Sequence, residues 1–208
     1  MLAGKRFAFL GEPDHFIIEK YPFRLLLIQY LLERGWRHVG METGRSVGWR
    51  VDRYLETGDP PYLSDLGAEP PNPTDVAIHD KALEFVDGHD NPFHEQLRRI
   101  SESRAPGTPR LHYWGYDLDL GVPLGSVKPI QWLLEGHAGS QVHELLSALD
   151  RLRGLSTDEQ LAQIEAIQNR LTASADIAPD GTPGELQSWL AFLHDSVAAE
   201  KRPSGSIS

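Results

Sequence analysis

The 208-residue chain has no cysteine, which excludes several chemistries at once. It can form no disulfide, no thiolate metal site and no cysteine nucleophile. Basic residues are also scarce, since 20 Lys and Arg stand against 30 Asp and Glu and give a formal net charge of -10. This balance disfavours attraction to nucleic acid or to anionic membranes, and no basic stripe interleaved with aromatic residues is present. We therefore expect neither nucleic acid nor a membrane as a partner.

Long apolar runs are missing as well. The run at residues 7–10 is too short for the core of a signal peptide, and the run at residues 25–28 falls far short of the ~20 residues of a membrane helix. With 40% hydrophobic residues, the chain is nevertheless long enough to bury a core. These features favour a globular, cytoplasmic protein.

Three common functional signatures are absent. The chain has no Gly-x-Ser-x-Gly elbow, which disfavours a serine nucleophile, and no glycine-rich phosphate loop. His94-Glu95 lacks the second histidine, one turn later, that a zinc-protease helix requires. We therefore expect no cofactor, while metal binding by carboxylate and imidazole groups at the strand ends described next remains an open alternative.

Three short apolar runs that each lead into charged residues indicate buried strands. They cover residues 7–10, 38–42 and 111–117. Helical patterns separate them, so the strands should be parallel and their carboxyl ends should meet at one edge of a sheet, where ligands bind. The polar residues expected at that edge are Glu12, His15, Glu42 and Asp117.

The predicted fold class is α/β, with a parallel β-sheet core between flanking helices in a three-layer arrangement. The helices expected around the strands cover residues 22–35, 46–55, 77–86 and 92–100. Beyond residue 121 the alternation stops, and three amphipathic helices are predicted at residues 139–152, 157–173 and 183–200. The last two begin at capping-box signals, Ser156 with Glu159 and Thr182 with Glu185. This pattern predicts an α/β core (1–121), a helical hairpin or bundle (122–201) and a disordered tail (202–208).

The loop after the first predicted strand offers an acid/base pair. Glu12 next to His15 could orient the imidazole, fix its tautomer and raise its pKa, as a base that activates water requires. Arg24, on the first turn of the next helix, could donate a hydrogen bond to an oxyanion. The structural alternatives are a helix cap for the pair and a salt bridge for Arg24.

Aromatic residues supply a further set of candidates. Trp49 and Tyr54 follow the second strand and could line an apolar ligand pocket. A place in the core is the alternative for both, and it is the expectation for Tyr113 and Trp114.

Taken together, these motifs resemble the erythromycin esterase family. The matching segments are Gly11-Glu12-x-x-His15, Arg24 in an Arg-x-Leu-Leu helix that runs to Leu-x-x-x-Gly35, Val39-Gly40-Met41-Glu42, Asp52-Arg53-Tyr54-Leu55 and Tyr113-Trp114-Gly115-Tyr116-Asp117. The resemblance covers residues 7–120, and the later helices look like the helical insertion of that family.

The resemblance implies a hydrolase in which a histidine activates water to open a macrolide lactone, without a serine nucleophile or a metal. His15 would be the base, Glu12 its orienting partner, and Arg24 and Glu42 the other polar members of the catalytic group. Phe16 stands where the family usually has a small residue and would narrow the pocket. The substrate-contacting candidates are Asp117, Trp49, Tyr54 and Phe16.

The expected partner is a small-molecule ester or lactone. Members of the family continue beyond the helical insertion into strands that carry a second essential histidine. We therefore expect a homo-oligomer or a missing C-terminal half to complete the site. Two alternatives stay open: a noncatalytic domain that binds a ligand or a partner, and a metal-assisted hydrolase that uses the same strand-end residues.

Overall fold

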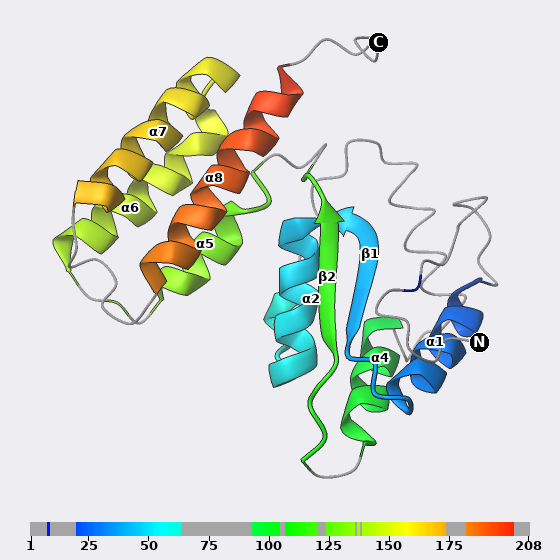
Figure 1. The fold of residues 1–208 in the computed structure, drawn as a ribbon. Helices are drawn as coiled ribbons and strands as arrows, with labels where there is room; N and C mark the ends of the chain where they lie inside the picture. Colours follow the sequence, from blue (N-terminus) through cyan, green and yellow to red (C-terminus); the bar gives the residue numbers. More distant parts are fainter. Residues whose placement is uncertain are drawn as a thin grey trace.

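The structure is a computed structural model that describes residues 8, 20–63, 93–104, 107–119, 124–135, 137, 139–173 and 182–201 (Figure 1). Its first part contains α1 (Lys20–Leu32), β1 (His38–Gly44), α2 (Arg45–Thr57), the 3-10 helix η1 (Pro60–Tyr62), α4 (Phe93–Glu102) and β2 (His112–Asp117). Its second part contains α5 (Val127–Leu134), α6 (Ser140–Arg151), the 3-10 helix η2 (Leu152–Gly154), α7 (Thr157–Ala173) and α8 (Thr182–Glu200). The fold is therefore mixed α/β and mostly helical.

The two strands pair in parallel, as the sequence predicts. His38 lies opposite His112, and Gly44 lies opposite Asp117, with an irregular register between Met41 and Gly44. Both arrowheads point toward the same edge in Figure 1. Within the described residues the sheet has these two strands. The strand predicted at 7–10 and the helix predicted at 77–86 lie outside the described residues, so the three-layer arrangement stays a prediction.

One face of the sheet packs on helices and forms the first core. Leu111 and Tyr113 of the β2 segment are buried there, whereas the next residue, Trp114, is 55% exposed. The expectation that Trp114 belongs to the core is therefore wrong, because side chains alternate between the two faces of a strand. The buried helix residues of this core are Leu25, Ile28, Leu32, Val51, Tyr54, Leu55, Phe93 and Leu97.

Two glycines let helix α2 touch strand β2 directly. A Cβ added to Gly48 would lie 1.9 Å from the backbone nitrogen of Gly115, and one added to Gly115 would lie 2.1 Å from the carbonyl oxygen of Gly44. Real side chains do not tolerate such distances, so both positions need glycine. The backbone of β2 at Gly115 is thus in close contact with α2 at Gly48 and with the end of β1 at Gly44.

The helices α5 to α8 enclose the second core. Its largest fully buried side chain is Trp189, and Leu152, Ile164, Leu186, Leu190 and Leu193 are each fully buried around it. The predicted contact between Ser156 and Glu159 at the start of α7 is present: the Glu159 carboxylate accepts hydrogen bonds from the Ser156 backbone N–H (2.9 Å) and hydroxyl (2.6 Å). The first of these bonds is the one by which the glutamate of a capping box satisfies the backbone N–H of the residue before the helix.

Helix α5 was not among the predicted helices. Pro129 is its third residue, and proline is tolerated in the first turn because those N–H groups have no partner inside the helix. The segment is also only 8 residues long, too short for a clear periodicity. Its Val127, Ile130 and Leu134 side chains are buried in the second core. Tertiary packing therefore stabilises a helix that the local sequence pattern does not predict.

Aromatic rings join the two cores. Trp49 of α2 stacks on Trp132 of α5, with ring centroids 6.0 Å apart, and meets Trp189 of α8 edge-on at 5.9 Å. Arg45 lies over the Trp189 ring at 4.7 Å and donates a hydrogen bond to the Ser188 hydroxyl at 2.9 Å. Within the described ranges, no helix has the length and apolar character needed to cross a bilayer.

The close contact of Gly48 with β2 leads to a prediction for stability, for which Gly184 provides the control. Gly48 and Gly184 both lie in helices, where replacement by alanine normally stabilises by about 1 kcal/mol. A Cβ at Gly184 would meet nothing within 4 Å, so Gly184→Ala should stabilise the protein as expected. Gly48→Ala should instead destabilise it by about 2 kcal/mol because the added methyl strikes the β2 backbone. Urea unfolding monitored by circular dichroism measures both effects, and a stabilising Gly48→Ala would contradict the contact.

Candidate functional site

Two predicted site residues lie where the paired strands end. Asp117 is the last residue of β2 and pairs with Gly44, two positions after Glu42 on β1. Both carboxylates are on the exposed side of the protein, and that of Asp117 accepts a hydrogen bond from the Leu118 backbone N–H at 2.8 Å. The parallel pairing thus brings these two acids from distant parts of the sequence to one edge, as expected.

Helix α1 packs against α4 in the first core (Figure 1). Arg24 is the fifth residue of this helix and is half-buried. The place of Arg24 beside the strand-end acids stays a prediction. The predicted base His15, its partner Glu12 and the neighbouring Phe16 lie outside the described residues, so the acid/base pair stays a prediction.

The buried carboxylate of Asp119, behind this edge, was missed by the sequence reasoning. Asp119 is only 4% exposed. One oxygen accepts a hydrogen bond from the Ser46 backbone N–H at 3.2 Å, and the other accepts one from the Ser126 hydroxyl at 2.9 Å. A Cβ on Gly44 would lie 2.2 Å from the first oxygen, so the carboxylate occupies the space that a side chain there would need.

Asp119 thereby connects the segment after β2 with the start of α2 and the residue that precedes α5. Burial raises the pKa of Asp119, against the opposing effect of the hydrogen bonds from Ser46 and Ser126. The sequence carries only a weak signal for this position. Leu111 and Tyr113 face the core, and counting on by twos along the chain would place residue 119 on the same face. Strand β2 ends at Asp117, however, so this alternation does not reach residue 119.

Tyr54, a predicted substrate contact, lies in the first core. It is 7% exposed, and its hydroxyl donates a hydrogen bond to the Glu95 carboxylate on α4. Burial, followed by this hydrogen bond, raises the pKa of Tyr54, and the same bond lowers the pKa of Glu95. The described contacts of Tyr54 therefore link α2 with α4, and its role in ligand binding stays a prediction.

Trp49, the other aromatic candidate, lies at the junction between the two cores. In addition to Trp132 and Trp189, its ring meets Tyr62 edge-on at 6.2 Å, and the Arg53 guanidinium lies over it at 5.2 Å. These contacts hold α2 against the helices of the second core. The structure does not bring Trp49 into contact with the strand-end acids, and a ligand contact for it stays a prediction.

The open face of the sheet carries aromatic side chains that the sequence reasoning did not select. Trp114 is 55% and Tyr116 is 69% exposed. The Trp114 indole N–H donates to Nδ1 of His38 at 3.0 Å, and the Tyr116 ring lies 3.4 Å from where a Cβ of Gly40 would be. Because parallel sheets are normally covered on both faces, these residues mark a face that is available for contact.

The opposite end of the strands is held by a salt bridge. The Arg110 guanidinium donates hydrogen bonds to both carboxylate oxygens of Asp52, at 3.0 and 2.8 Å. Asp52 also accepts a hydrogen bond from the Tyr113 backbone N–H at 2.8 Å. Burial, and then the charge of Arg110, lowers the pKa of the neighbouring His112. This cluster aligns α2 with β2, which gives Asp52 of the Asp52-Arg53-Tyr54-Leu55 motif a structural role.

No cluster of three or more metal-binding side chains occurs among the described residues. Of the four ligands in the metal alternative, Glu42 and Asp117 are described, whereas Glu12 and His15 lie outside the described residues. Glu42 and Asp117 supply carboxylate oxygens, and the imidazole of the predicted set belongs to His15. The metal-assisted alternative therefore stays untested.

The chain is similar in fold to a protein from Bacillus cereus of known crystal structure. The TM-score is 0.53 at 14% sequence identity, and the match covers 89% of this chain. The chain spans 45% of the length of the Bacillus cereus chain. Comparison with models of protein families and with curated proteins gave no match. At this identity the likeness establishes the fold and carries no information on activity.

The contacts of Asp119 lead to a prediction for stability at neutral pH. Asp119→Ala removes the acceptor for Ser46 and Ser126 and should cost about 1–3 kcal/mol, because buried donors are then left without partners. Asp117→Ala is the matched control: it removes an exposed carboxylate two residues away and should change stability by about 0.5 kcal/mol or less. Equal losses in urea unfolding would refute the structural role of Asp119.

The raised pKa of Asp119 predicts the pH dependence of stability. Between the ordinary carboxyl value of about 3.9 and the raised folded value, the folded state retains a proton that the unfolded state has lost. The free energy of unfolding contributed by Asp119 therefore falls as the pH rises through this window. Asp119→Asn cannot titrate, so its stability relative to the wild type should increase from pH 4 to pH 7. A pH-independent difference in urea unfolding would contradict this expectation.

Proposed function

We propose that this chain is an esterase-like hydrolase, or the part of one that carries the catalytic base. In this proposal His15 activates water for attack on an ester or lactone carbonyl. The observation that carries the proposal is the parallel pairing of β1 and β2, which puts Glu42 and Asp117 at one edge. These residues close two of the segments that resemble the erythromycin esterase family, and the edge of a parallel sheet is where α/β enzymes bind their ligands.

The proposed reaction needs one base and one oxyanion donor. Water attacks the carbonyl carbon while His15 takes its proton, and the carbonyl π electrons move onto the oxygen. Arg24 donates hydrogen bonds to this oxyanion. When the tetrahedral intermediate collapses, the bond to the leaving alkoxide breaks, and the alkoxide takes the proton from the imidazolium.

The supporting residues complete the proposed site. Glu12 would hold the imidazole in the tautomer that accepts a proton, and Glu42 would contribute a second carboxylate at the strand end. Phe16 and Asp117 would contact the substrate, and the strand predicted at residues 7–10 would join β1 and β2 within a three-layer core. A macrolide lactone is the substrate class that the family resemblance suggests.

Hydrolysis can be measured as a mass increase of one water on a panel of macrolides and simpler lactones. We expect His15→Ala to reduce turnover by a factor of about 10² to 10⁴, the usual contribution of a general base. Glu42→Gln should also lower turnover. Glu144→Gln, which changes an exposed acid on α6, should leave turnover unchanged.

The controls separate this proposal from its alternatives. Circular dichroism verifies that each variant is folded. Equal turnover by the wild type and His15→Ala would refute the proposed base, and failure of the folded wild type to hydrolyse the panel would favour the noncatalytic binding domain. Loss of turnover with a chelator, restored by a divalent cation, would favour the metal-assisted hydrolase.

A further inference from the structure

Two histidines begin the two strands of the sheet. His38 of β1 and His112 of β2 lie opposite each other in the parallel pairing, and their imidazole rings stack with centroids 5.0 Å apart and an angle of 18° between the ring planes. Trp114 follows two residues along β2, on the same face of the strand as His112. Its ring centroid lies 6.0 Å from that of His38. The three rings form one cluster on the open face of the sheet, at the end where the strands begin.

The hydrogen bond inside this cluster depends on the protonation state of His38. The indole N–H of Trp114 can only donate, so Nδ1 of His38, at 3.0 Å, has to accept. Nδ1 accepts only in a neutral imidazole whose proton is on Nε2, because a protonated ring carries hydrogen on both nitrogens. The bond between Trp114 and the first residue of β1 therefore exists in one charge state of His38 and is lost in the other.

We propose that His38 and Trp114 form a pH-sensitive latch on the open face of the sheet. While His38 is neutral, the latch is closed and the Trp114 ring is held against the start of β1. When His38 takes up a proton, two N–H donors face each other and the Trp114 side chain turns away. Trp114 is 55% exposed, so this movement sacrifices little buried area. Since imidazole changes its charge between pH 5 and 8, the open face presents a different aromatic surface at each end of this range.

The surroundings of the pair keep the second histidine neutral. Among the described elements, β2 and α2 pack on β1, and the charged groups that they and the residue before β2 bring to this end are Arg110, Asp52 and Glu56. Burial, and then the charge of Arg110, lowers the pKa of His112, whereas Asp52 has the opposite effect. Two stacked imidazolium rings would also repel each other. His112 therefore stays neutral as the pH falls, and a single proton on His38 opens the latch.

The indole N–H resonance of Trp114 reports the state of the latch in a two-dimensional ¹H–¹⁵N spectrum. The chain has five tryptophans, and the signal of Trp114 is the one that is missing in Trp114→Phe. As the pH is lowered from about 8 to about 5.5, it should move upfield because a bond to an imidazole nitrogen is replaced by one to water. Its midpoint should equal that of the Cε1–H resonance of His38. A Trp114 signal that does not move over this range would overturn the proposal.

Substitutions at residue 38 test whether this histidine is the titrating group. His38→Asn keeps an acceptor oxygen near the position of Nδ1 and cannot titrate, so the Trp114 signal should stay at its high-pH position throughout. His38→Ala removes the acceptor, and the signal should stay at its low-pH position. A transition that persists in either variant would overturn the proposal.

Two further variants serve as controls, and circular dichroism verifies that each is folded. His143→Asn changes an exposed histidine on α6 and should leave the transition of Trp114 unchanged. His112→Phe keeps a flat ring in the stack but removes its titration, and the transition should again be present. Loss of the transition in His112→Phe or in His143→Asn would assign the proton to a residue other than His38 and overturn the latch.

Discussion

A direct backbone contact between helix α2 and strand β2 organises the α/β part and its junction with the second core. Gly48 and Gly115 remove the side chains that would otherwise hold the helix away from the sheet. This close approach sets the position of α2, and α2 in turn carries Tyr54 into the first core and Trp49 toward the second. Gly48 and Gly115 therefore determine the positions of Trp49 and Tyr54, although neither glycine has a side chain that packs in a core.

Asp119 adds a polar connection at the same place. Its carboxylate receives hydrogen bonds from the first turn of α2 and from the residue that precedes α5, so one side chain aligns the end of the sheet with both helical regions. Burial of this group has an electrostatic cost, which its two hydrogen bonds and the positive end of the α2 dipole partly offset. The edge that carries Glu42 and Asp117 is thus connected to both helical regions by a buried, hydrogen-bonded side chain, and a binding or catalytic role at this edge would require such support.

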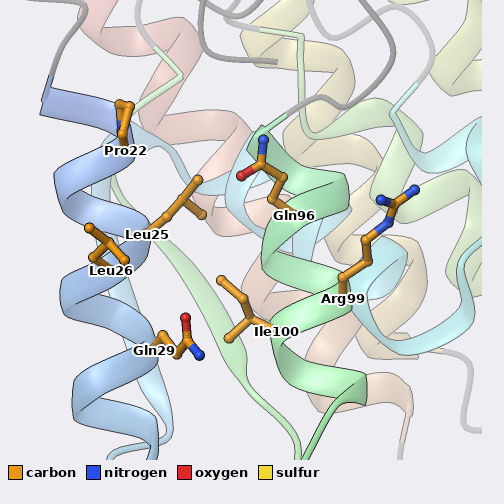
Figure 2. Close-up of a pocket in the computed structure, with 7 residues that line it drawn as sticks. All are labelled: Pro22, Leu25, Leu26, Gln29, Gln96, Arg99 and Ile100. Carbon is orange, nitrogen blue, oxygen red and sulfur yellow. The ribbon is translucent and has the colours of Figure 1, made fainter. Parts of the chain in front are cut away.

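Two surfaces of the α/β part remain without a partner within the described residues. The open sheet face carries Trp114 and Tyr116 beside the strand-end acids, and the outer side of α1 carries Phe23, Leu26 and Tyr30. The sheet face adjoins the strand ends that carry Glu42 and Asp117, and the α1 surface lies beside the groove between α1 and α4 (Figure 2). The two exposed surfaces are therefore distinct.

Local patterns in the sequence are enough to predict the type and order of most of the elements. Apolar periodicity predicted the strands at 38–42 and 111–117 and the three helices beyond residue 139, and the capping box of Ser156 marked the start of α7, because these signals act over one or two turns. Strand alternation places Tyr113 inside and, by the same rule, Trp114 outside. Three outcomes follow from tertiary contacts instead: Asp119 is buried, Trp49 and Tyr54 pack into different cores, and α5 is a helix. Each of these outcomes depends on contacts between residues that are distant in sequence, whose free energy no local pattern contains.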